Sequence, residues 1–148
     1  MPLRNLVAGE NRSEQTSLNK IFGKCQKLVF KNEAHNCENF IFQSQYEDGK
    51  TGFWFLSKDN GRNLEAFTFS GRIQDQILLE GSETKQPIKL IHSVSNNMPA
   101  VKTLAEGFCL YGNLLSGVAK IECKAIDYDR NIFTGIFLTD GRPPQDAK

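Results

Sequence analysis

The sequence predicts an all-β fold: a single antiparallel barrel or a strongly curved sheet, with one or two short helices. Phe-x-Phe pairs recur at 40–42, 53–55 and 67–69, in steps of 13 and 14 residues. Side chains at i and i+2 share one face of a strand, so each pair places two rings on the same side of a sheet. The turn signals between the pairs, at 47–50 and 58–62, are typical of antiparallel hairpins. We therefore expect a three-stranded meander with six rings on one face.

The chain of 148 residues suits one domain with a substantial core. Residues 1–15 are polar and without periodicity, which predicts a flexible tail. A single barrel-like domain is expected over 16–140. A second tail is expected over 141–148, because Pro143 and Pro144 lack the N–H donor that a strand ladder needs.

Strands follow one another too closely for the helices that a parallel sheet requires. They are expected at 25–31, 38–46, 51–57, 64–70, 72–79, 87–94, 116–127 and 131–138. A short helix is expected from Thr16 or Ser17 to Gly23, where apolar residues have helical spacing. A second helix is expected over 98–106, with Pro99 in its first turn.

Charge and cysteine usage narrow the classes of function. Lys and Arg number 18 against 17 for Asp and Glu, a net charge of +1, so no global field attracts polyanions. The cysteines Cys25, Cys37, Cys109 and Cys123 permit two disulfides. The first residues do not resemble a signal peptide, so reduced thiols and a cytoplasmic location are expected. No apolar run reaches the roughly 18 residues of a membrane span, and no membrane partner is expected.

One stretch resembles a known family. Residues 52–61, GFWFLSKDNG, and 67–70, FTFS, resemble the two ribonucleoprotein-type strands of cold-shock domains. The resemblance covers 46–70 and implies an OB-like barrel that stacks the bases of single-stranded RNA or DNA. The residues expected to bind nucleic acid are the rings Tyr46, Phe53, Phe55 and Phe69 and the cations Lys50, Lys58 and Arg62. Ala66 and Thr68 stand where the family has further stacking residues, which reduces the expected affinity.

The function expected first is therefore a non-catalytic binding module for single-stranded nucleic acid. Two alternatives stay open: a barrel that holds an apolar small molecule among the same rings, and a protein-interaction or regulatory subunit that adds a partner at a sheet edge. The rings also suit a plain core, since Phe is often buried. The pair His35 and Cys37, with Cys25, is an incomplete metal set, and His92 lies in no catalytic motif. No catalytic residue, metal or cofactor is expected, and the oligomeric state is open.

Overall fold

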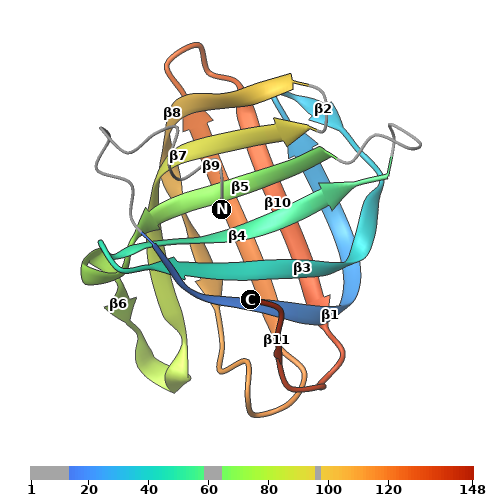
Figure 1. The fold of residues 1–148 in the computed structure, drawn as a ribbon, viewed down its shortest axis with the longest axis vertical. Coiled ribbons are helices and arrows are strands. Elements are labelled where there is room, and N and C mark those ends of the chain that lie inside the picture. Colours follow the sequence, from blue (N-terminus) through green and yellow to red (C-terminus); the bar gives the residue numbers. More distant parts are fainter. Residues whose placement is uncertain (1–13, 59–64, 96–97) are drawn as a thin grey trace.

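The computed structural model describes residues 14–58, 65–95 and 98–148. Eight strands form a closed antiparallel barrel, in which each long strand pairs with the next along the chain and the last returns to the first (Figure 1). The barrel strands are β1 (Gln15–Phe30), β3 (Cys37–Tyr46), β4 (Lys50–Ser57), β5 (Glu65–Arg72), β7 (Thr84–Ser95), β8 (Met98–Tyr111), β9 (Lys120–Asp127) and β10 (Ile132–Thr139). The predicted all-β barrel is confirmed. It has more strands than the five of an OB-type barrel.

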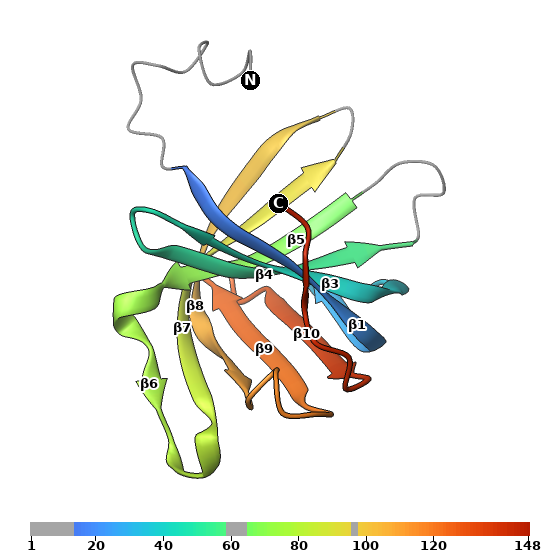
Figure 2. The ribbon, with the colours of Figure 1, turned by 60° about the horizontal axis from the view of Figure 1, so that its bottom comes forward.

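Short elements decorate the barrel: the strands β2 (Glu33–Ala34), β6 (Ile77–Leu78) and β11 (Gln145–Asp146), and the 3₁₀ turns η1 (Ile73–Asp75) and η2 (Glu80–Ser82). The connection from β5 to β7, with β6, projects from the lower end of the barrel together with the β8–β9 loop (Figures 1 and 2). The strand expected over 72–79 is therefore wrong for most of its length. No α-helix occurs in the part of the chain that the structure describes, and so none is long and apolar enough to span a membrane.

Both expected helices are wrong. The residues that suggested the first helix belong to β1, where Ile21 pairs with Ile41 and points into the barrel while Phe22 points outward. The residues that suggested the second helix open β8, where Ala105 and Cys109 face the core. In both cases pairing with neighbouring strands overrides a local helical spacing.

The C-terminal segment is not a free tail. In β11, Gln145 pairs with Lys20 and Asp146 pairs with Asn19. The Ala147 N–H also donates to the Leu18 carbonyl at 2.8 Å. The two prolines lie just before this strand, where no ladder bond is needed. The N-terminal tail expected over 1–15 lies, up to residue 13, outside the described residues.

The register divides the three Phe-x-Phe pairs between two faces. Ile41 pairs with Phe55, and Phe55 in turn pairs with Phe67, so these three side chains point into the barrel. Because neighbouring residues of a strand point to opposite faces, Phe40 and Phe42 point outward. The expectation that all six rings share one face is wrong, and four of them line the interior.

Aromatic rings fill the barrel. Phe55 is fully buried and meets Phe69 edge to face at 5.7 Å between ring centroids. Farther along, Phe30 stacks on Phe67 at 4.3 Å and meets Phe133 edge-on at 5.2 Å. The interior is therefore a packed core and not an open channel.

All four cysteines form disulfides, so the expected reduced thiols are wrong. Cys25 of β1 bonds to Cys37 of β3, and Cys109 of β8 bonds to Cys123 of β9. The second pair is a directly opposed cross-strand pair inside the barrel, where both cysteines are fully buried.

Candidate functional site

The residues expected to bind nucleic acid do not form one surface. The rings of Phe53, Phe55 and Phe69 are at most 2 % exposed, because they face the barrel interior. Their faces contact other core side chains and are not available to stack bases. Tyr46 is only partly buried, and its hydroxyl accepts a hydrogen bond from the Gln15 amide at 3.3 Å.

The cations expected beside those rings lie apart. Lys50 is at the start of β4, where its ammonium lies 3.6 Å from the Asp48 carboxylate. Lys58 follows the other end of β4, with its ammonium 3.8 Å from the Glu38 carboxylate. Arg62 lies outside the described residues. The two described lysines therefore flank opposite ends of the barrel wall.

A different set of rings faces outward. We define the outer aromatic surface as Phe22, Phe40, Phe42 and Trp54, with Lys20. Phe42 meets Phe40 and Trp54 edge to face, at 5.8 and 6.3 Å between centroids. The Lys20 ammonium lies 4.1 Å from the Phe40 ring centroid, a cation–π distance. All four rings are only partly buried.

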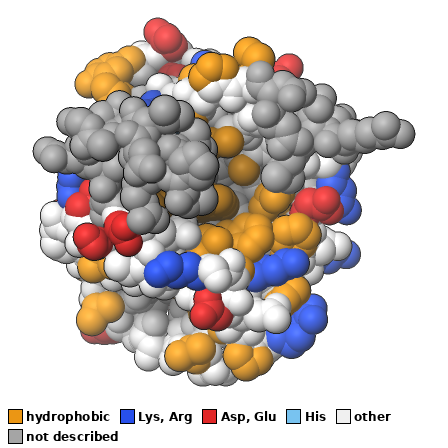
Figure 3. Space-filling model, in the orientation of Figure 1, with side chains coloured by type: hydrophobic (Ala, Val, Ile, Leu, Met, Phe, Trp, Pro, Cys, Tyr) orange, Lys and Arg blue, Asp and Glu red, His pale blue; other side chains and the backbone are white. Residues whose placement is uncertain are grey.

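The space-filling view shows hydrophobic side chains beside Lys and Arg side chains on the face that carries β3 and β4 (Figure 3). The residues expected from the sequence to bind nucleic acid did not include Phe40, Phe42 or Trp54, and Phe22 was assigned to a helix. The missing signal was the register of β3 against β4, which no local pattern supplies.

A pocket opens where the β5–β7 connection and the β8–β9 loop meet the barrel. This mouth pocket has a volume of about 610 Å³. It is lined by Gln43, Leu78, Leu79, Ser82, Glu83, Thr84, Tyr111, Gly112, Asn113 and Leu114. Both loops project at the lower end of the molecule in Figures 1 and 2. The pocket therefore lies at one end of the barrel, beside both loops, and is open to solvent.

Tyr111 joins the mouth pocket to the core. Its ring meets Phe53 edge to face at 5.0 Å, which places an aromatic pair beneath the pocket. Its hydroxyl accepts a hydrogen bond from the Gln76 amide at 3.2 Å. Burial raises the pKa of the Tyr111 phenol above its ordinary value, so the group remains protonated near neutral pH and can donate a hydrogen bond.

The loops around the mouth pocket carry exposed aliphatic side chains. Leu78 is 82 % exposed and Leu115 is 77 % exposed, with Ile77 and Val118 also exposed. Residues 77–79, an apolar run, fall within the strand expected over 72–79. Their exposure shows instead that this run serves neither the core nor a long ladder.

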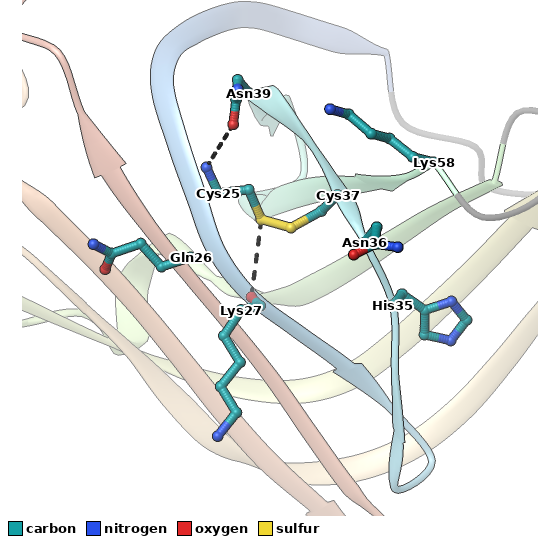
Figure 4. Close-up of a pocket in the computed structure, with 8 residues that line it drawn as sticks. All are labelled: Cys25, Gln26, Lys27, His35, Asn36, Cys37, Asn39 and Lys58. Carbon is teal, nitrogen blue, oxygen red and sulfur yellow. Dashed lines mark hydrogen bonds between the residues drawn. A yellow bond between two sulfur atoms is a disulfide. The ribbon is translucent and has the colours of Figure 1, made fainter.

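A second, more polar pocket lies in the barrel wall, around Cys25 of β1 and Cys37 of β3. This wall pocket has a volume of about 430 Å³ and is lined by Cys25, Gln26, Lys27, His35, Asn36, Cys37, Asn39 and Lys58. Figure 4 shows the Cys25–Cys37 disulfide between Asn39 and Lys27. The Cys25 sulfur lies 3.9 Å from the Lys27 carbonyl oxygen, a contact and not a hydrogen bond, because a disulfide sulfur carries no hydrogen.

The wall pocket contains the three residues of the incomplete metal set. His35 lines it with Cys25 and Cys37, but the two sulfurs are bonded to each other and offer no thiolate ligand. Within 14–58, 65–95 and 98–148, no group of three or more His, Cys, Asp or Glu residues could hold a metal ion.

Comparison with known proteins adds no relative. No protein-family model, curated protein or solved structure matches the chain.

Proposed function

We propose that this protein is a non-catalytic binding module that holds a small, largely apolar molecule in the mouth pocket. The observation that carries the proposal is a pocket of about 610 Å³ between the barrel end and two loops with exposed leucines. Small-molecule sites commonly have volumes of about 300–1,000 Å³ and combine apolar walls with a few polar groups. The mouth pocket combines these properties.

The apolar part of the ligand would contact the loop leucines. Leu78 and Leu79 approach from the β5–β7 connection and Leu114 from the β8–β9 loop. Burying one such side chain against a ligand contributes about 1.5–3 kcal/mol. Ligand binding would therefore remove from water the leucine surface that the free protein exposes.

The polar part of the ligand would be a hydrogen-bond acceptor near Tyr111. The phenol oxygen already accepts from Gln76, which leaves the phenol hydrogen to be donated to a bound group. Gln43 and Asn113 also line the pocket and carry side-chain amides, although the Asn113 oxygen already accepts from the Leu115 N–H at 2.9 Å. A carbonyl, ether or carboxylate at one end of an apolar molecule fits this arrangement.

The sequence suggested, as an alternative, an apolar molecule held among the rings inside the barrel, and the proposal moves this ligand to the mouth pocket. A ligand in the barrel interior would have to displace phenylalanines such as Phe55 and Phe133, which are fully buried. Displacing well-packed core side chains is costly. We therefore assign the ligand to the mouth pocket and keep the interior as core.

A matched pair of leucine variants tests the proposal. Leu78 lines the mouth pocket, whereas Leu104 is 64 % exposed on β8 and does not line it. Leu78→Glu is expected to weaken binding of the apolar dye 1-anilinonaphthalene-8-sulfonate about tenfold, because a charge replaces an apolar contact. Leu104→Glu is expected to leave binding unchanged. Titration of dye fluorescence measures both, and equal affinities for the two variants would contradict the proposal.

A second candidate function is single-stranded nucleic-acid binding on the outer aromatic surface. The specific observation in its favour is a set of partly exposed rings with the Lys20 ammonium over Phe40. Base stacking on exposed rings contributes about 1–3 kcal/mol per base. None of these four outer rings is among the rings that the cold-shock resemblance implies.

Trp54 fluorescence tests the second candidate. Short oligothymidylate is expected to quench it, with an affinity that falls as salt rises. Lys20→Gln should weaken this binding, and Lys89→Gln, which removes an exposed lysine paired with Glu106, should not. An unchanged spectrum at saturating oligonucleotide would reject nucleic acid as the ligand of this surface.

The two disulfides indicate the kind of cellular compartment in which the protein works. Two disulfides are typical of proteins that work in oxidising compartments, where thiols do not stay reduced. We therefore propose such a compartment in place of the cytoplasm.

A further inference from the structure

The wall of the barrel is interrupted between β1 and β3. Their ladder ends at the pair Phe22–Phe40, and β1 next pairs on this side at Val29, with Ala34 of β2. We call residues 23–27 and 36–39, which face each other across this interval, the wall seam. The other edge of β1 stays paired with β10 here, through a bulge between Cys25 and Lys27.

The Cys25–Cys37 disulfide crosses the wall seam. Beside it, the Cys25 N–H donates to the Asn39 side-chain oxygen at 3.1 Å. A side-chain hydrogen bond of this kind contributes about 1 kcal/mol, so the covalent bond is the stronger restraint on the seam.

The two disulfides differ in access to solvent. Cys25 and Cys37 are partly exposed and line the wall pocket, which has room for a small reagent. Cys109 and Cys123 are 0 % exposed, inside the barrel. A thiolate must reach a sulfur atom directly to attack a disulfide, so access separates the reactivity of the two bonds.

The wall pocket is lined by two lysines, Lys27 and Lys58, and by no Asp or Glu. The Lys58 ammonium is paired with the neighbouring Glu38 carboxylate at 3.8 Å, and the Lys27 side chain extends away from the disulfide (Figure 4). In Figure 4 the Lys58 side chain extends on the Asn39 side of the disulfide. A cation beside a disulfide stabilises a thiolate, but Lys58 is shared with Glu38, so the difference in reactivity rests on access to the sulfurs.

We propose that Cys25–Cys37 is a thiol–disulfide exchange site that latches the wall seam. A thiolate of a dithiol reductant attacks one of the two sulfurs, which forms a mixed disulfide and releases the other cysteine as a thiolate. The second thiol of the reductant, after losing its proton to solvent, then attacks the mixed disulfide. The reductant leaves as its own disulfide, and two electrons have passed to the protein, whose Cys25 and Cys37 take up protons. This inference concerns a site separate from the mouth pocket and does not rest on the proposed ligand.

Differential alkylation of the native full chain tests the exchange site. During graded treatment with dithiothreitol, Cys25 and Cys37 are expected to become alkylated at least about tenfold faster than Cys109 and Cys123, as mapped by peptide mass spectrometry. In denaturing urea the difference should disappear, because access is then equal. Equal native rates, or earlier reduction of Cys109–Cys123, would overturn the proposal.

Backbone hydrogen exchange tests the latch. Selective reduction is expected to speed exchange at 23–27 and 36–39 and leave β8 and β9 unchanged. The variant Cys25→Ala with Cys37→Ala should reproduce this pattern without any reductant, which separates loss of the bond from other effects of dithiothreitol. Unaltered exchange at the seam in both the reduced protein and the variant would show that the disulfide does not act as a latch.

Discussion

At the scale of single residues, the packing of the Phe55 ring requires glycine at position 135. A Cβ at Gly135 of β10 would lie 2.7 Å from the Phe55 ring carbons Cε1 and Cζ. Since Phe55 is fully buried among other rings, it has little room to move away. Glycine at this position therefore lets a phenylalanine from β4 reach the opposite wall.

We expect Gly135→Ala to lower the free energy of unfolding by about 1–3 kcal/mol, the usual cost of overpacking a core. Gly112→Ala is the matched control, because its Cβ would meet Ala119 at an ordinary 3.9 Å. Urea denaturation measures both. If Gly135→Ala costs no more than Gly112→Ala, the Phe55 ring does not occupy this position in solution.

His92 makes stability depend on pH. Burial, then the charges of Lys102 and Lys50, lower its pKa below the ordinary value of 6.5. The unfolded chain thus binds a proton at a higher pH than the folded protein does. The folded state therefore loses stability as pH falls from the unfolded pKa toward the lowered folded one.

His92→Gln is expected to reduce the loss of unfolding free energy between about pH 7.5 and pH 5, because the titrating group is gone. Urea midpoints at both pH values measure the difference, and shared carboxylate effects cancel between variant and parent. Lys102→Gln should act in the same direction, because removing this charge raises the His92 pKa partway back toward its ordinary value. An unchanged pH difference in His92→Gln would contradict the assignment.

At the scale of elements, β11 continues the wall where β10 ends. The first half of β1 pairs with β3 on one edge and with β11 on the other. Without β11, this half of β1 would present an unpaired edge, which is a template for association with other chains. The C-terminal residues therefore cover part of this edge of β1.

Ala147→Pro tests the role of β11. Proline removes the N–H that donates to the Leu18 carbonyl, at an expected cost of about 0.5–1.5 kcal/mol. Hydrogen exchange along β11 should become faster. Ala147→Ser, which keeps the N–H, serves as the control. Identical exchange in the two variants would show that β11 does not pair stably with β1.

At the scale of the whole molecule, closure joins the first barrel strand, β1, to the last, β10. Gly23 of β1 pairs with Thr139 of β10. Contacts between distant residues slow folding, because loop entropy is lost before the contacts form.

We therefore expect the disulfide-intact protein to refold in milliseconds to seconds or more slowly, as all-β domains do. Trp54 is a suitable stopped-flow probe, since its indole N–H donates to the Ser44 hydroxyl at 2.9 Å in the folded state. Far-ultraviolet circular dichroism should follow the same time course. Refolding complete within microseconds would contradict this dependence on long-range pairing.

The sequence alone determined the fold class and most of the strands. Phe-x-Phe spacing and the turn residues between the pairs correctly predicted β3, β4 and β5, because strand periodicity and turn chemistry are local properties. The helix expected over 98–106 failed because its spacing also suits a strand whose partners, β7 and β9, supply the ladder bonds.

The tertiary structure decided the position of every candidate site. The register of β3 against β4 turned Phe40 and Phe42 outward while Phe53 and Phe55 turned inward, and a shift of one residue would have reversed this. Pairing of β1 with β3 brought Cys25 to Cys37. Pairing of β7 with both β6 and β8 placed Leu78 and Tyr111 on the same mouth pocket. These are relations between distant segments, set by pairing and packing energies that no single stretch of sequence contains.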